Sequence, residues 1–149
     1  MAIRNIRLEG DPILRKKSKK VEKIDDRIIT LLDDMEETMR HAQGVGLAAP
    51  QVGVLRAVII VDAGDRLIEL INPQLVEARG KEIKAEGCLS IPDRAGDVER
   101  PTWVKVKGLN REGEEVEVIG EGLTARALCH ELDHLEGILF IDRVIEESR

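Results

Sequence analysis

Aromatic residues are almost absent from this sequence of 149 residues, which holds one tryptophan, Trp103, one phenylalanine, Phe140, and no tyrosine. The core must therefore be built mainly from Ile, Leu, Val and Ala. The length suits a single domain over residues 1–149, because two domains of half this size would each have a small core.

Long apolar runs are also missing. The opening MAIRNIRLEG has no apolar stretch of the length that a secretory signal needs, and nowhere do about 18 apolar residues follow one another. We therefore expect a cytoplasmic protein with no membrane partner. Cysteine is scarce too: Cys88 and Cys129 lie far apart, and in a reducing compartment a structural disulfide is not the expected use for them.

Positive charge does not dominate, since the formal net charge is −6. Non-specific binding to nucleic acid draws its affinity from Lys and Arg on phosphates, so no direct nucleic-acid partner is expected. One basic run, RKKSKK at residues 15–20, could form such a patch. No aromatic residue interleaves it and the whole chain is acidic, so a solvated loop beside the first helix is the preferred interpretation.

Apolar periodicity predicts two helices. In residues 25–44, apolar side chains recur at helical spacing at Ile28, Leu32, Met35 and Met39. Asp25 or Asp26 can cap the start of this helix. A second helix is expected near the end of the chain, with Thr124 as its N-cap and Gly137 as its stop.

Strand-like runs separated by turn signals lie between the helices, at residues 56–63, 67–78, 81–91, 102–110 and 114–122. Connections this short suit antiparallel pairing. We therefore expect an α+β fold, in which a mainly antiparallel β-sheet packs around a C-terminal metal-binding α-helix.

The metal prediction comes from the stretch CHELDHLEG, in which His130 and His134 are four residues apart and Glu131 follows the first. Four residues bring the two imidazoles to within about 40° of each other, one turn apart, so both can bind one ion. Leu123 and Ala127 share this face. Glu131 lies about 100° away, where its carboxylate can reach a water rather than the ion. A separate, polar face of the helix carries Arg126, Asp133 and Glu136.

A third ligand decides whether this motif holds a catalytic metal. HExxH has three fixed positions and arises by chance in many helices, whereas a catalytic zinc-type site needs three protein ligands and an open position. The longer pattern HExxHxxGxxH fails at Phe140, which cannot bind a metal. The upstream candidates are His41, Cys88, Cys129 or a carboxylate. Cys129 points about 100° away from His130, which favours a core or pocket residue over a ligand.

Three stretches resemble, in this order, the three motifs of peptide deformylase: GVGLAAPQ at residues 44–51, EGCLS at 86–90 and HELDH at 130–134. The resemblance runs from GDPILRKKSKKV near the start to LFIDRV near the end. It implies that Cys88, His130 and His134 bind a divalent metal, Fe²⁺ in many members, with Zn²⁺, Ni²⁺ or Co²⁺ able to replace it. Ligand chemistry alone favours zinc.

The resemblance also implies roles for other residues. Glu131 would be the general base, while the Gln51 side chain and the backbone N–H of Leu89 would stabilise the oxyanion. Glu86 and Arg100 would form a supporting ion pair near the site. The implied reaction is hydrolysis of the formyl group of N-formylmethionyl peptides and nascent chains, with release of formate.

The implied substrate site is shared between the first and third motifs. Without the family, the first motif is a glycine-rich turn; the resemblance implies that Gly44, Val45 and Gly46 pair with the substrate like an added strand. Val45, Leu123 and Ala127 would form the walls of the methionine pocket.

Two features depart from the family pattern. Cys129 stands where many members have glutamine, and the chain ends at RVIEESR without the longer basic helix by which some members dock on the ribosome, so ribosome docking is not expected. Two other functions share HExxH: a metallopeptidase that cleaves ordinary amide bonds, and a non-catalytic protein with a structural zinc. A structural zinc needs a fourth ligand, and no Cys or His with suitable spacing supplies it. A deformylase-like protein without activity is disfavoured because the motif residues are intact.

Overall fold

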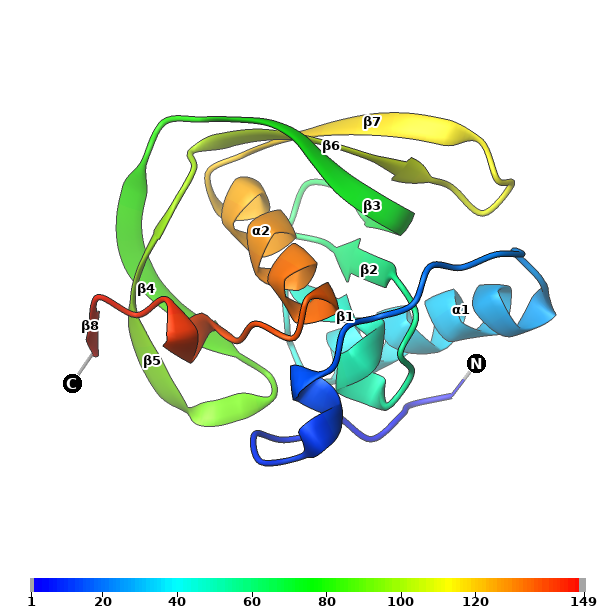
Figure 1. Ribbon diagram of the computed structural model, residues 1–149, viewed down its shortest axis with the longest axis horizontal. Helices are drawn as coiled ribbons and strands as arrows, with labels where there is room; N and C mark the ends of the chain where they lie inside the picture. Colours follow the sequence, from blue (N-terminus) through cyan, green and yellow to red (C-terminus); the bar gives the residue numbers. More distant parts are fainter. Residues whose placement is uncertain (1, 148–149) are drawn as a thin grey trace.

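The computed structural model describes residues 2–147 (Figure 1). Within this range the chain forms two α-helices, α1 (Asp26–His41) and α2 (Leu123–Leu135). The strands are β1 (Gly46–Ala48), β2 (Val58–Val61), β3 (Ile68–Arg79), β4 (Glu82–Cys88), β5 (Ile91–Arg100), β6 (Trp103–Leu109), β7 (Glu115–Glu121) and β8 (Glu146–Glu147). Short 3-10 segments lie at Pro12–Arg15, Ala49–Val52 and Phe140–Asp142.

The strands form two antiparallel sheets. One has the order β1-β2-β3-β6-β7, and the other has the order β4-β5-β8. Figure 1 shows α2 in the middle of the molecule, between the β4–β5 ribbon and the larger sheet, with α1 to the side of β1 and β2. This confirms the expected α+β fold, in which mainly antiparallel strands surround the C-terminal helix.

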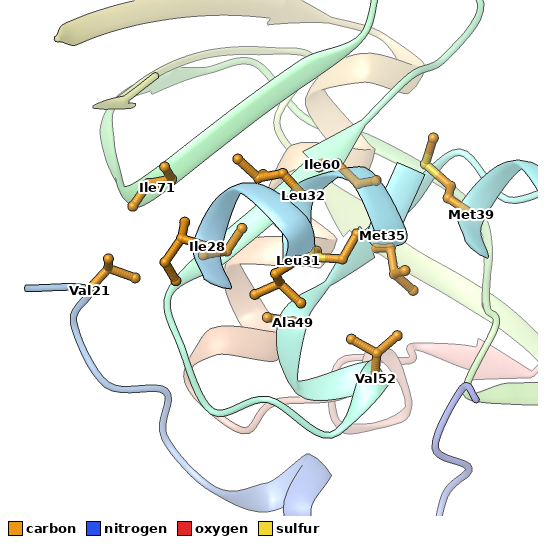
Figure 2. Packing of buried hydrophobic residues seen from close by; sticks show 12 residues of the cluster. Val21, Ile28, Leu31, Leu32, Met35, Met39, Ala49, Val52, Ile60 and Ile71 are labelled. Carbon is orange, nitrogen blue, oxygen red and sulfur yellow. The ribbon is translucent and has the colours of Figure 1, made fainter. Parts of the chain in front are cut away.

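Helix α1 follows the predicted periodicity. The Asp25 carboxylate caps its start by accepting hydrogen bonds from the N–H groups of Arg27 and Ile28. Its apolar side packs on β1, β2 and the 3-10 segment that follows β1, in a buried cluster that includes Leu31, Leu32, Met35 and Met39 (Figure 2). Truncating one of these side chains to alanine would cost about 2–5 kcal/mol of folding free energy.

The start of α2 differs from the prediction. Thr124 is not the N-cap: the helix begins at Leu123 and is preceded by Gly122, whose φ of 57° lets the chain turn directly from β7 into the helix. Gly137, with a φ of 74°, does follow the end of α2. A Cβ on Gly137 would lie 2.5 Å from the carbonyl oxygen of Arg15, so glycine is required there for space as well.

The strands agree with the sequence in part. Four predicted runs each match one strand, namely β2, β3, β6 and β7. The run at residues 81–91 instead covers β4 and the turn into β5. Three strands were not predicted: β5, whose sequence IPDRAGDVER is rich in residues disfavoured in strands, β1, whose residues alone indicate a glycine-rich turn, and the two-residue β8.

The two aromatic residues lie in different parts of the fold. Trp103 begins β6 opposite Arg79 of β3, whose guanidinium lies over the indole ring at 4.3 Å from its centroid. Phe140 is buried with Leu14, Val98 and other residues in a small cluster beside α2.

No helix within residues 2–147 is long and apolar enough to cross a bilayer. The expectation about ribosome docking rests on the chain end RVIEESR, whose last two residues lie outside the described residues. That expectation therefore stays a prediction.

Candidate metal centre

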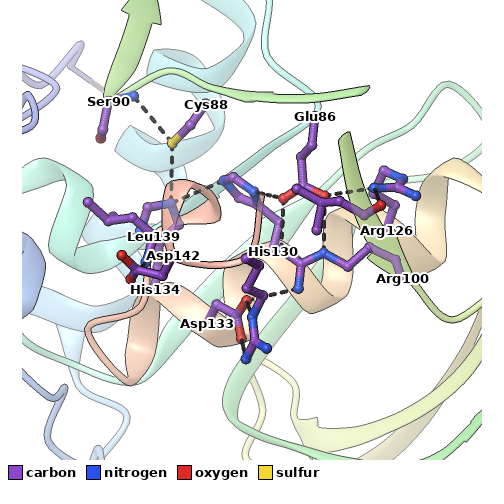
Figure 3. A network of polar contacts seen from close by, with 12 residues as sticks. Glu86, Cys88, Ser90, Arg100, Arg126, His130, Asp133, His134, Leu139 and Asp142 are labelled. Carbon is purple, nitrogen blue, oxygen red and sulfur yellow. Dashed lines mark hydrogen bonds and ion pairs between the residues drawn. The ribbon is translucent and has the colours of Figure 1, made fainter. Parts of the chain in front are cut away.

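Cys88, His130 and His134 meet beside the centre of the molecule. Cys88 ends β4, while the two histidines lie one turn apart on α2 (Figure 3). The Cys88 Sγ is 3.4 Å from His134 Nε2, and the two Nε2 atoms are 3.2 Å apart. The structure therefore brings together the three predicted ligands. Of the other candidates, Cys129 is buried in the hydrophobic cluster around α2, and His41 is exposed at the end of α1.

These two spacings match those of neighbouring ligands on one metal ion, and all three ligand atoms lie within 4.8 Å of one another. Bonds of about 2.0–2.1 Å to nitrogen and about 2.3 Å to sulfur put neighbouring donor atoms of a tetrahedral site about 3.3–3.6 Å apart. Donor atoms that face one another this closely need a shared proton or a cation between them. The group includes no fourth protein ligand among residues 2–147, whereas a structural zinc site is closed by four.

Glu86 orients His130. Its Oε2 lies 2.6 Å from His130 Nδ1, and Arg100 donates to both carboxylate oxygens at 3.0 and 2.7 Å, which confirms the expected ion pair. Burial raises the pKa of Glu86, but hydrogen bonds from His130 and Arg100 outweigh it and lower the pKa to about 2. Because a carboxylate only accepts, His130 donates from Nδ1, which leaves Nε2 as the ring nitrogen that faces His134.

The surroundings shift the pKa values of the two histidines in opposite directions. Burial lowers the pKa of the His130 ring, but the Glu131 charge and the hydrogen bonds to Cys88 and Glu86 raise it well above its ordinary value. Burial and the nearby His130 charge hold the pKa of His134 well below its ordinary value. The pair therefore does not hold two positive charges, and His134 presents a neutral imidazole, the form that binds metals.

Glu131 is buried beside these ligands, with 3% of its surface exposed. Its Oε1 has no hydrogen-bond partner among the described residues. Burial raises the pKa of Glu131 to about 7, against the opposing charge of His130. A carboxyl group with a pKa near the working pH can both take up and return a proton.

Gln51 lies on the other side of Cys88. Its Nε2 donates to Ser90 Oγ at 3.0 Å and lies 3.6 Å from Cys88 Sγ. Its Oε1 accepts from the N–H of Ala48 at 3.0 Å, which fixes which end of the amide faces the site. The buried Gln51 side chain is therefore held with its NH₂ group toward Cys88.

A cavity of about 420 Å³ opens beside the metal ligands. Its lining includes every residue predicted for substrate binding, namely Gly44, Val45, Gly46, Leu123 and Ala127, together with Gln51, Leu89, His130 and Glu131. Two wider hollows, of about 990 and 1020 Å³, lie elsewhere and are lined by none of the three ligands. Val45 and Leu123 are 41% and 53% exposed, so these two walls of the cavity are open to a ligand.

Comparison with known proteins decides the family. A family model described as polypeptide deformylase matches residues 3–149. The chain belongs to this family. A peptide deformylase of Alkaliphilus metalliredigens is 62% identical over 99% of this chain and 100% of its own. Among solved structures, the deformylase of Thermotoga maritima has a TM-score of 0.92 at 45% identity, covering 95% of this chain and 97% of its own.

A deformylase of Synechococcus elongatus, solved in complex with actinonin, has a TM-score of 0.90 at 43% identity, covering 93% of this chain and 77% of its own. As a member of the deformylase family, the chain is a metal-dependent hydrolase that removes the formyl group from N-terminal methionine. The Cys88, His130 and His134 group offers the metal site that such an enzyme needs.

Two residues of this deformylase site escaped the sequence analysis. Ser90 accepts from Gln51 and donates its backbone N–H to Cys88 Sγ at 3.4 Å. Arg126, which helical periodicity places on a polar face of α2, is buried against Glu86. The motif EGCLS contained the signal for Ser90, whereas no local pattern could show that β4 and β5 cover Arg126.

Gly46→Ala is expected to lower kcat of this deformylase by about 10–10²-fold, because misplacing a reacting group by an ångström has effects of this size. A Cβ on Gly46 would lie 2.6 Å from Glu131 Oε2 and 3.1 Å from Cδ, so the buried carboxylate must move. Formate release measures kcat, while metal content and the melting temperature check that the rest of the site is intact. An unchanged kcat would contradict the placement of the carboxylate against Gly46.

Proposed function

We propose that this deformylase acts on N-formylmethionyl peptides and nascent chains, with Cys88, His130 and His134 as metal ligands and Glu131 as the general base. One observation carries the proposal: Cys88 and His130, two of the three converging ligands, line the same cavity as the buried Glu131, whose Oε1 has no hydrogen-bond partner in the described residues. We further propose that the enzyme works in the cytoplasm, in line with its two free cysteines.

The proposed metal is Fe²⁺, with Zn²⁺, Ni²⁺ or Co²⁺ able to replace it. One thiolate and two imidazoles suit all four of these ions, and geometry and availability choose among them. Bound there, a divalent ion would supply Lewis acidity, which polarises a carbonyl group and makes water easier to deprotonate. Glu86 would support this site by holding His130 with Nε2 toward the ion.

In the proposed reaction Glu131 moves the proton. It takes a proton from the water that attacks the formyl carbon, so that the new C–O bond forms as the carboxylate becomes a carboxylic acid. The C–N bond then breaks, and Glu131 returns the proton to the departing amine nitrogen. Formate and a peptide with a free amino terminus result, and Glu131 is again a carboxylate.

Gln51 and Leu89 are proposed to stabilise the oxyanion that develops on the formyl oxygen. The Gln51 NH₂ group already faces Cys88 and is held by Ser90 and Ala48, so it would not need to reorganise during the reaction. Leu89 follows Cys88 directly in the chain and lines the same cavity. Its backbone N–H is the proposed second donor.

The peptide is proposed to lie along β1. This strand stands at the edge of the larger sheet, so it can pair on its second side with an extended peptide through Gly44, Val45 and Gly46. The apolar walls formed by Val45, Leu123 and Ala127 would then receive the methionine side chain.

Formate release by protein purified without air, together with its metal content, tests this function. The formylmethionyl form of one short peptide should release formate, whereas its acetylated and unblocked forms should remain intact. Cleavage of an internal peptide bond in the unblocked form would instead indicate a metallopeptidase. Iron in the active protein would support the proposed metal. Protein that is active with another ion but inactive with Fe²⁺ would contradict it.

Gln51→Leu is expected to lower kcat by about 10²–10³-fold with the metal retained, because an oxyanion donor acts chiefly in the transition state. The leucine is close in size to glutamine but cannot donate. Steady-state formate release and metal content measure the two effects, and the exposed Gln74→Leu serves as the control. A change confined to KM would assign Gln51 to ground-state binding of the substrate.

A further inference from the structure

Arg126 lies on α2 one turn before His130 and is buried, with 6% of its surface exposed. Its Nη1 donates to Glu86 Oε1 at 3.0 Å, on the oxygen opposite the one that contacts His130 (Figure 3). Arg100 donates to the same carboxylate, but it stands on β5 next to β4, so that pair lies within one sheet. The contact from Arg126 instead joins the helix to the sheet.

The same guanidinium also binds the main chain of both strands of the β4–β5 ribbon. It donates to the carbonyl oxygens of Val98 at 2.9 Å and Glu82 at 3.0 Å, with a longer contact of 3.4 Å to Lys84. Lys84 and Val98 are paired across the two strands. One planar fork of donors therefore fixes the ribbon against α2 at the end away from Cys88.

This link matters because the candidate metal ligands are divided between the two elements that it joins. Cys88 ends β4, while His130 and His134 stand on α2, so the distance from sulfur to nitrogen depends on how β4 sits against the helix. Besides the contact between His134 and Cys88, polar side-chain contacts from α2 to the ribbon come from Arg126, His130 and Asp133, and Arg126 alone of these binds the ribbon's main chain in the described residues.

We propose that Arg126 is a positioning residue, which sets the separation between Cys88 and the two histidines and thereby the affinity and the ligand field of the metal. It lines the cavity but makes no hydrogen bond or ion pair to the three ligand side chains in the described residues, and it acts through the β4–β5 ribbon and Glu86. The inference rests on the metal centre proposed above.

Arg126→Leu and Arg126→Lys test this role. Lysine keeps the charge but cannot reproduce the fork, and leucine removes both. The matched control is Arg111→Leu, because Arg111 likewise joins separate elements, through Glu69 at 2.8 and 2.9 Å and Asp33 at 2.7 Å, but lines no part of the cavity. For each protein, chelator competition gives the dissociation constant of Co²⁺, and visible absorption reports its ligand field.

Arg126→Leu should bind Co²⁺ about 10–100-fold more weakly, as when other groups that orient metal ligands are removed. Its absorption bands should shift, Arg126→Lys should show a smaller loss, and Arg111→Leu should lose stability alone. If Arg126→Leu does not fold, the Co²⁺ affinity and absorption of Arg126→Lys test the inference. Folded Arg126 variants that match the unmodified protein in affinity and spectrum would overturn the inference, as would an equal loss in Arg111→Leu.

The metal centre itself has a separate test. Failure of the unmodified protein to bind Co²⁺, or undiminished binding after Cys88→Ala, would contradict the proposed ligands rather than the role of Arg126.

Discussion

Glu131→Gln is expected to lower kcat for formate release by about 10²–10⁴-fold, because glutamine keeps the shape of the side chain but cannot take the proton of the attacking water. Metal content should stay near one ion per chain, since Glu131 is not among the converging ligands. The buried Glu131 carboxyl has a pKa raised to about 7, which suits a group that takes up and returns a proton within one turnover.

Glu136→Gln is the matched control, because Glu136 stands just beyond the end of the same helix and is exposed. Its kcat should equal that of the unmodified protein. Near-normal turnover by Glu131→Gln, with the metal in place, would rule out Glu131 as the general base. Loss of the metal in that variant would instead place the carboxylate among the ligands.

Cys88→Ala is expected to abolish both stoichiometric metal and activity. A catalytic site of this kind needs three protein ligands, and the two histidines that remain on α2 would hold a divalent ion only weakly. Elemental analysis of the purified variant, beside formate release, measures both effects. A Cys88→Ala protein that still carries one tightly held ion would remove the thiolate from the site.

Cys129→Ala is the control for that experiment. Cys129 is buried with Leu128 and Leu135 against the larger sheet, so its loss should cost about 1 kcal/mol of folding free energy and leave metal and turnover unchanged. Burial raises the pKa of its thiol, which makes it an unreactive side chain. A loss of metal in this variant would show that Cys129 takes part in the site.

Helical periodicity alone predicted that two of the three metal ligands lie together. Residues four apart on a helix meet on one face, and the two Nε2 atoms of His130 and His134 do so. The third ligand could not be found this way, because Cys88 is 46 residues from His134 in the sequence and reaches it only when β4 packs beside α2. Resemblance to a family supplied that residue.

Two departures from the sequence prediction, at β5 and on α2, have a common physical cause. The sequence IPDRAGDVER has little strand propensity of its own, yet it forms β5 by pairing with β4 along most of its length. Arg126 and Asp133 have the pattern of a polar helix face, but the ribbon buries Arg126, and Arg100 pairs with Asp133 at 2.8 Å. Partners distant in sequence decided both outcomes.

The single indole of Trp103 is an intrinsic fluorescence probe of how this chain folds. With no tyrosine present, intrinsic fluorescence comes from one site, where Arg79 lies over the ring at the paired ends of β3 and β6. Emission during refolding would therefore time the closure of the larger sheet. The appearance of Co²⁺ absorption would report when β4 packs beside α2. The delay between the two signals would show whether the metal centre forms together with that sheet or only after it has closed.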